Sequence, residues 1–289
     1  MPSSPKYIKI ALIILAIILM IVFRATSSDF SFVFKSQNLS KIVQDNLGSS
    51  EKYAIYIEDL ADGESYSLHA LDSFPAASLY KVYLLAATLK EVEEGSLKLE
   101  DNLKAEKQHL IEVFQGVDFG YEDAPEQIEY SVEETMQRVG RISDNFASIM
   151  LAEKISWEKI QDISYLLGAR NTIIKDPITT SAADIGLFFK KLYLSQVVSD
   201  KVSNKIMELL LLSKINDRIP AGVPDGVKIV HKTGELSRVR HDGGIVYLPN
   251  GRAYVIVLMS KDLQFEDEGV ETLAKISKDV YEYFKNKSK

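Results

Sequence analysis

The hydrophobic pattern has the short period of β-strands in two stretches shortly after residue 50 and in three stretches near the C-terminus. Short apolar runs bounded by Gly, Asp, Asn or Pro are typical of strands joined by tight turns. "ADGE" separates the early pair and "PNG" the last pair, and both are turn sequences. We therefore predict strands at "KYAIYIEDL", "SYSLHA", "VKIVHKTG", "GGIVYLP" and "AYVIVLMS".

Around these strands the apolar residues recur at helical spacing. One such stretch, "LSKIVQDNLG", precedes the strands, and an amphipathic stretch, "FEDEGVETLAKISKDVYEYFK", closes the chain. The middle holds a helix over 78–94 that Gly95 ends, and another behind the capping-box serine of "SVEETMQRVG". Further helices are predicted at "NFASIMLAEKI", "WEKIQDISYLLG" and "TTSAADIGLFFKKLYL".

Strands near both ends and helices between them predict an α+β, three-layer architecture. The economical arrangement is one antiparallel sheet of about five strands from both chain ends, flanked by helices, with an inserted all-helical lobe. No repeat, low-complexity tract or Pro/Gly linker divides residues 39–286, so we expect one domain there. An active site would lie in the crevice between sheet and lobe.

The N-terminus carries an unbroken apolar run over residues 10–23 behind two lysines. Its length is typical of a signal peptide, and counted from Tyr7 it is just long enough to span a membrane. We interpret 1–27 as an uncleaved membrane anchor, with a cleaved signal as the alternative, and 28–38 as a linker. The lysines favour a cytoplasmic start of the chain, so either interpretation exports the domain.

Composition narrows the possible functions. The net charge of −7 gives no reason to expect a nucleic-acid partner, which would call for a basic face. The absence of cysteine excludes disulfides, thiolate metal sites and a cysteine nucleophile. No two of the four histidines have the spacing of metal ligands on a helix. Neither a metal nor another cofactor is therefore expected.

The segment "FPAASLYKVYLL" places Lys81 three residues after Ser78, on the same face of an apolar helix. A helix that is apolar on every side is buried, so a lysine in its first turn has to be neutral, paired or both. A lysine of depressed pKa beside a hydroxyl is a general base that activates a nucleophile. The spacing alone is weak evidence, because S-x-x-K recurs elsewhere in the chain and Ser78 could be only an N-cap.

Two further segments carry signals that are weak when taken alone. S-D-N at 143–145 lies between two predicted helices, where a helix cap is the plain alternative. K-T-G at 232–234 ends a predicted strand, where the plain alternative is an exposed strand end with a turn glycine. Each exact tripeptide should occur by chance in fewer than roughly one chain in ten of this length. The occurrence of both tripeptides in one chain, each in the expected setting, is very unlikely to be an accident.

The ordered set S-x-x-K, S-D-N, K-T-G resembles the penicillin-recognising serine hydrolases, and in detail the class A β-lactamases. The resemblance extends from Leu39 to Phe284. It implies that Ser78 attacks a lactam or peptide carbonyl to give an acyl-enzyme and that Lys81 accepts its proton, a role for which a water-relayed carboxylate competes in the family. The other implied site residues are Ser143 as proton donor to the departing nitrogen, Asn145 for the substrate's side-chain amide, Lys232 and Thr233 for its carboxylate, Gly234 for clearance, and the backbone N–H groups of Ser78 and Glu235 as the oxyanion hole.

The chain departs from the class A pattern in the loop before "TTSAAD". The family carries there a glutamate, with asparagine four residues on, which activates the water that releases the acyl group. Here the loop is short, and no glutamate between 143 and 232 has that partner. Arg170 and Asp176 are candidates for the paired ends of a truncated loop, and Asp176 or Glu153 for a substitute base. General-base assistance is typically worth 10²–10⁴-fold, so we expect the acyl-enzyme to persist.

Four functions remain open from the sequence. The first is an exported serine hydrolase that opens β-lactams, with slow deacylation. The second is a membrane-anchored D-Ala-D-Ala carboxypeptidase or transpeptidase acting on peptidoglycan peptides, which the anchor and the missing glutamate favour. The third is a sensor that β-lactams or wall fragments acylate without turnover, and the fourth is an inactive structural relative. A monomer is expected in each case, and a second carboxylate contact from Arg238 or Arg240 is a weaker expectation than a solvated arginine.

Overall fold

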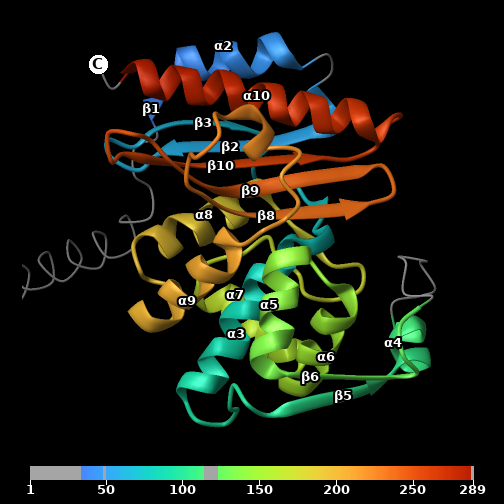
Figure 1. The fold of residues 1–289 in the computed structure, drawn as a ribbon. Coiled ribbons are helices and arrows are strands. Elements are labelled where there is room, and N and C mark those ends of the chain that lie inside the picture. Colours follow the sequence, from blue (N-terminus) through green and yellow to red (C-terminus); the bar gives the residue numbers. More distant parts are fainter. Residues whose placement is uncertain (1–33, 48–49, 114–122, 288–289) are drawn as a thin grey trace, which may run out of the picture. The chain divides into compact units, whose positions relative to one another are not determined.

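The central sheet takes its strands from both ends of the chain, as predicted (Figure 1). The computed structural model describes residues 34–47, 50–113 and 123–287. Antiparallel pairing gives the strand order β1-β3-β2-β10-β9-β8, so β8 forms one edge. The strands are β1 (Phe34–Lys35), β2 (Tyr53–Asp59), β3 (Glu64–Leu68), β8 (Ile229–Leu236), β9 (Val239–Tyr247) and β10 (Ala253–Ser260).

Helices cover both faces of this sheet. On one face lie α2 (Gln37–Asn46) and α10 (Glu266–Lys287), whose apolar stripes pack with the sheet residues around Tyr254 (Figure 1). On the other face lies α8 (Ala182–Tyr193), which contacts β2, β9 and β10. β2 and β10 are almost wholly buried on both sides, which explains why "AYVIVLMS" reads as a continuous apolar run.

The inserted lobe is built around α3 (Lys81–Glu93), which is buried on nearly every side, as its composition predicts. The helices around it are α4 (Lys107–Val113), α5 (Val132–Ile142), α6 (Asn145–Ile155), α7 (Trp157–Leu166) and α9 (Asp200–Leu211). Ser131 accepts a hydrogen bond from Glu134 N, which confirms the predicted cap of α5. A two-stranded ribbon, β5 (Asn102–Glu106) with β6 (Gln127–Ser131), adds strand structure that an all-helical lobe does not contain.

Short elements connect these parts. They are the 3₁₀ turns η1 (Ser50–Lys52), η2 (Ala77–Tyr80) and η3 (Pro220–Gly222), and the bridge between β4 (Phe74–Pro75) and β7 (Thr179–Thr180). The helix predicted over 78–94 therefore begins as a 3₁₀ turn. The α+β class with an antiparallel sheet and an inserted lobe is confirmed. The predicted anchor at 1–27 lies outside the described residues, and none of the described helices meets the length and apolarity that a membrane crossing requires.

Candidate active site

Ser78 lies in η2, where the chain leaves β4 and enters α3. Ala77, just before it, has a φ of +45°, a left-handed conformation that costs roughly 1–2 kcal/mol for a residue with a Cβ. Ala76 N donates to Ile178 O at 2.9 Å, which holds the turn against the loop that precedes β7. The N-cap positions of η2 and α3 are Ala76 and Tyr80. The half-buried Ser78 is therefore not a helix cap.

Lys81 is 1 % exposed and points its amine at the S-D-N segment. Its Nζ donates to Ser143 O and to Asn145 Oδ1, both at 2.7 Å, and lies 3.4 Å from Ser143 Oγ. Within the described part of the chain, Lys81 forms no ion pair with a carboxylate. A neutral amine that donates two hydrogens to two oxygens keeps its lone pair for a third partner.

The charge state of Lys81 follows from this setting. Burial, and then the charge of Lys232, lower the Lys81 pKa well below its ordinary value of 10.5, and Asp144 opposes them. Desolvation disfavours the ammonium form, and no carboxylate of residues 34–47, 50–113 or 123–287 contacts the amine to restore it. Lys81 can therefore act as a proton acceptor, as the buried lysine in the sequence predicts.

The S-D-N segment combines a helix cap with the site. Ser143 ends α5 with a left-handed φ of +57°, and Asp144 caps α6 by accepting from Ala147 N at 3.0 Å. Arg138 Nε donates to the same carboxylate at 2.8 Å. The predicted cap thus exists, and it fixes the turn that presents Ser143 and Asn145 to Lys81. Cap and site are not alternatives here.

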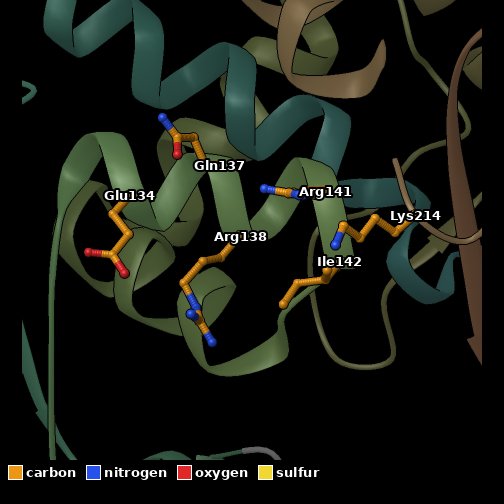
Figure 2. A pocket seen from close by; sticks show the side chains of 6 residues that line it. All are labelled: Glu134, Gln137, Arg138, Arg141, Ile142 and Lys214. Atoms are coloured by element: carbon orange, nitrogen blue, oxygen red, sulfur yellow. The ribbon is translucent and has the colours of Figure 1, made fainter. Parts of the chain in front are cut away.

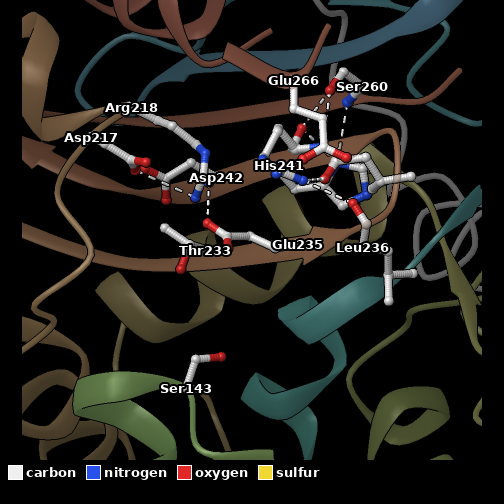
Figure 3. Close-up of polar contacts among 12 residues, drawn as sticks. Ser143, Asp217, Arg218, Thr233, Glu235, Leu236, His241, Asp242, Ser260 and Glu266 are labelled. Carbon is white, nitrogen blue, oxygen red and sulfur yellow. Dashed lines mark hydrogen bonds and ion pairs between the residues drawn. The ribbon is translucent and has the colours of Figure 1, made fainter. Parts of the chain in front are cut away.

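Lys232 is buried on β8, and its Nζ donates to Ser143 Oγ at 2.7 Å and to Thr233 O at 2.8 Å. Burial lowers the Lys232 pKa to about 7, against the opposing effect of Asp242 and Glu235. Ser143 Oγ therefore lies within 3.4 Å of both lysine amines. Figure 3 shows Ser143 opposite Thr233. An exposed strand end is excluded, because Lys232 and Thr233 are each only 2 % exposed.

Gly234 provides a close approach rather than a turn, since β8 continues to Leu236. A Cβ at Gly234 would lie 3.2 Å from Ala77 Cβ, 3.3 Å from Leu79 Cγ and 3.3 Å from Ser78 N. The backbone of β8 is therefore packed directly against the nucleophile turn. The N–H groups of Ser78 and Glu235, predicted as the oxyanion hole, belong to these two adjoining segments. Their role stays a prediction.

Sequence reasoning missed Arg218, which precedes β8 in the segment "NDRIP" and matches no motif. Its side chain is 1 % exposed, and its Nη2 pairs with the Glu235 carboxylate (Figure 3). Nη1 lies 3.5 Å from Asp217 Oδ1, and neither Nε nor Nη1 has a hydrogen-bond partner among the residues described. After burial, the charge of Arg218 is a further, smaller cause that lowers the pKa of Lys232. A buried guanidinium with unused donors beside K-T-G is a candidate for substrate contact.

A buried network holds the Arg218 segment against the sheet. Asp242, opposite Thr233 on β9, accepts from Ile219 N at 3.0 Å and lies 2.9 Å from His231 Nδ1. His231 Nε2 lies 3.1 Å from Asn216 Oδ1. Arg238 and Arg240, the candidates for a second contact with the substrate carboxylate, have partners elsewhere. Arg238 donates to Leu263 O, and Arg240 pairs with Glu266. Neither is directed to K-T-G.

The short loop before β7 is not closed by the proposed pair. Arg170 lies over the Tyr165 ring at 5.8 Å, and Asp176 is exposed and unpaired within the described residues. That expectation was wrong. Instead the buried Asp184 of α8 accepts from Asn171 N at 2.7 Å and from Thr172 Oγ1 at 2.8 Å.

Glu153 does not face the site either. It lies 2.8 Å from His109 Nε2 on the outer part of the lobe. Eight residues separate it from Asn145 on α6, which is about 12 Å along the helix axis. The prediction that Glu153 substitutes for the missing glutamate is therefore not supported, and Asp176 is the one acidic residue of the loop over 168–178.

A pocket of ≈ 320 Å³ adjoins the S-D-N segment along α5. Figure 2 shows its lining residues, which are Glu134, Gln137, Arg138, Arg141, Ile142 and Lys214. Lys214 N donates to Arg141 O at 2.9 Å, and this hydrogen bond holds the chain that follows α9 against the end of α5. The pocket surface carries three cationic side chains and one acidic one. In the part of the chain that the structure describes, no cluster of His, Asp and Glu could hold a metal ion.

Comparison with known families decides which chemistry this geometry serves. The family model described as the β-lactamase enzyme family matches residues 36–284. The chain belongs to the β-lactamase enzyme family. It is thus an enzyme of the serine-hydrolase type that the three motifs predict, and the resemblance drawn from them is confirmed.

Individual members of the β-lactamase family are distant from this chain. The extended-spectrum β-lactamase PER-1 of Pseudomonas aeruginosa is 19 % identical, over 94 % of both chains. β-Lactamase VEB-1 of the same organism is 20 % identical, over 96 % of this chain and 98 % of its own. Among solved structures, PBP-A is 25 % identical with a TM-score of 0.78, covering 87 % of this chain and 97 % of its own.

A mutant of PBP-A, solved as an acyl-enzyme with penicillin G, is 26 % identical to this chain with a TM-score of 0.78. It covers 86 % of this chain and 96 % of its own. The TLA-3 extended-spectrum β-lactamase, at 20 % identity and a TM-score of 0.75, shares the fold. The solved structures of PBP-A and TLA-3 therefore share the fold of this chain.

Proposed function

We propose that this β-lactamase family member is acylated by β-lactams at Ser78 and releases the acyl group slowly. The observation that carries the proposal is the position of Ser143 Oγ, 2.7 Å from Lys232 Nζ and 3.4 Å from Lys81 Nζ. One hydroxyl thus connects two buried amines next to the nucleophile turn. A structural role alone gives no reason to bury two lysines that contact no carboxylate among the described residues.

The proposed acylation moves one proton around this set. Ser78 Oγ attacks the lactam carbonyl carbon while its proton passes to the lone pair of Lys81 Nζ. As the C–N bond breaks, Ser143 gives its proton to the departing nitrogen and regains one from Lys81. The N–H groups of Ser78 and Glu235 would stabilise the negative carbonyl oxygen, and such donors are worth ~3–4 kcal/mol each. Asn145 and Thr233 would hold the substrate.

Slow release follows from the loop that faces the nucleophile turn. Its Ile178 carbonyl bonds Ala76 N, two residues before Ser78, so a base carried by this loop would stand near the acyl carbonyl. Over residues 168–178 the chain offers only Asp176, which is exposed. Without general-base help, deacylation should be slower by about 10²–10⁴-fold.

Intact-mass spectrometry after incubation with penicillin G tests this proposal. A covalent adduct should form within minutes and decay over hours, and Ser78→Ala should form none. Ser73→Ala, which removes an exposed serine five residues earlier, is the matched control and should behave like wild type. An adduct in Ser78→Ala, or no adduct in wild type, would contradict the proposal.

A second candidate is a D-Ala-D-Ala carboxypeptidase or transpeptidase. Two observations favour it: the missing loop glutamate, and the likeness to PBP-A at 25–26 % identity, which exceeds the 19–20 % to PER-1 and VEB-1. Release of D-alanine from a muropeptide would support it. A sensor is the third candidate, and a stoichiometric burst with nitrocefin and no second cycle would indicate one.

Export and membrane anchoring remain part of the proposal. They are supported by the apolar run over residues 10–23, behind two lysines. The anchor predicts that the full chain sediments with membranes and is cut by protease added outside the cell. Recovery of a mature protein beginning after residue 27 would favour the cleaved signal instead.

A further inference from the structure

The corner of the site formed by Lys232, Thr233 and Arg218 contains a carboxylate of the protein itself. Glu235 follows Thr233 by two residues on β8, so both side chains lie on the same side of the strand. Its carboxylate pairs with Arg218 Nη2, as the dashed contact in Figure 3 shows. The Glu235 side chain is 45 % exposed and the Arg218 side chain 1 %. The acid thus covers the guanidinium from the solvent side.

The balance of charge in this corner does not favour an anion. Arg218 faces Glu235 on Nη2 and Asp217 at 3.5 Å from Nη1. Burial lowers the pKa of Lys232 to about 7, although Asp242 and Glu235 raise it, so its amine is partly deprotonated at neutral pH. Arg218 is thus matched by two carboxylates of the chain before any ligand arrives.

A ligand carboxylate placed beside Thr233 would meet Glu235 directly. It would have to displace Glu235 from Nη2 or lie next to it, and like charges in contact weaken binding. An amide or ester oxygen in the same place could accept from the Thr233 hydroxyl and leave the pair of Arg218 with Glu235 intact. Such an uncharged group would not be repelled by the Glu235 carboxylate.

We propose that Glu235 is a specificity residue, which makes this site discriminate against a free carboxylate beside the scissile amide and favour an uncharged amide or ester there. The inference rests on the proposed function, because it concerns the substrate of the same acylation. It differs from the carboxylate recognition that the resemblance implies for Lys232 and Thr233.

The test compares acylation of the full-length protein by penicillin G and by its methyl ester, which differ in that one carboxylate. Glu235→Gln removes the charge and keeps both the backbone N–H and the side-chain length. The second-order rate constant for acylation by the acid should rise about 5- to 20-fold, because the like charge of Glu235 is removed from a half-exposed site. The rate for the ester should change by a smaller factor than the rate for the acid, because the ester carries no charge for Glu235 to repel.

Glu129→Gln is the matched control, since it removes the same charge from β6, where Glu129 pairs with Lys104. It should change neither rate. Equal changes for acid and ester in Glu235→Gln would overturn the inference, since they would indicate that Glu235 only positions Arg218. An unchanged acid rate would overturn it as well, because Glu235 would then move aside freely.

A second readout does not depend on acylation. NMR titration of Ser78→Ala with N-acetyl-D-alanyl-D-alanine and with its C-terminal amide compares the same two charges. The amide should bind at least as tightly as the acid, and adding Glu235→Gln should tighten only the acid. A preference for the acid in Ser78→Ala alone would refute the inference. Absence of acylation in wild type refutes the proposed function alone, since this titration still decides the role of Glu235.

Discussion

Replacing Lys232 by methionine should stabilise the fold, by an amount that depends on pH. Burial lowers the pKa of Lys232 from 10.5 to about 7. A fall of that size corresponds to roughly 5 kcal/mol of unfolding free energy, offset in part by hydrogen bonds to Ser143 and Thr233. Lys232→Met should therefore raise the unfolding free energy by about 2–4 kcal/mol at pH 7.

The sign of the pH dependence follows from proton binding. Between pH 7 and 10.5 the unfolded chain holds a proton on Lys232 that the folded chain has lost, so wild-type stability rises with pH. The penalty is complete below pH 7 and vanishes above 10.5. The advantage of Lys232→Met should thus shrink by about 1.4 kcal/mol per pH unit in that window. Lys81 adds in the same direction, because the charge of Lys232 lowers its pKa.

Urea unfolding at several pH values, followed by fluorescence, measures this directly. Trp157 is the single tryptophan and packs 6.0 Å from the Tyr80 ring, beside the site. Lys287→Met is the control of opposite sign, because hydrogen bonds to Asp62 and Glu64 raise the Lys287 pKa. Its loss of stability should stay constant between pH 7 and 10. A constant difference for Lys232→Met, or a less stable variant throughout, would refute the reasoning.

Three further predictions concern the nucleophile and its loop. Lys81→Arg, which cannot give up its proton, should lower the acylation rate by about 10²–10⁴-fold between pH 6 and 10, measured by stopped-flow with nitrocefin. Gly234→Ala should slow acylation about 10-fold or more, because its Cβ would lie 3.3 Å from Ser78 N; a wild-type rate would show that the turn yields. Asp184→Ala should lower the unfolding free energy by about 2–3 kcal/mol, because the half-buried Asn171 N–H and the buried Thr172 hydroxyl lose their acceptor. Asp176→Ala should change it by less than ~0.5 kcal/mol.

The parts of the fold that the sequence predicts are those with a strong local signal. The strands from both ends have short apolar runs, and α5 has a capping-box serine that the structure uses. The S-x-x-K, S-D-N and K-T-G motifs come together because each lies on an element whose type could be predicted. Lys81 could be predicted as buried, since the residues that follow it in the first turns of α3 are apolar on every side.

The parts that escaped prediction depend on contacts between distant segments. Arg218 belongs to the site only because Asp242 on β9 holds its neighbour Ile219. The loop before β7 is closed by Asp184, which in sequence is one acid among many and in the structure is a buried acceptor. The predicted pairing of Arg170 with Asp176 was wrong because the spacing of two residues in the sequence does not determine the direction in which each side chain points.

The two lysines also tie substrate charge to catalytic strength. Both amines contact Ser143, and the charge of Lys232 lowers the pKa of Lys81, so their protonation is coupled. An anion bound beside Lys232 would favour its ammonium form and make Lys81 a weaker base. An uncharged ligand would leave Lys232 free to stay neutral and Lys81 the stronger base. Discrimination by Glu235 against carboxylates would therefore act on the acylation step as well as on binding.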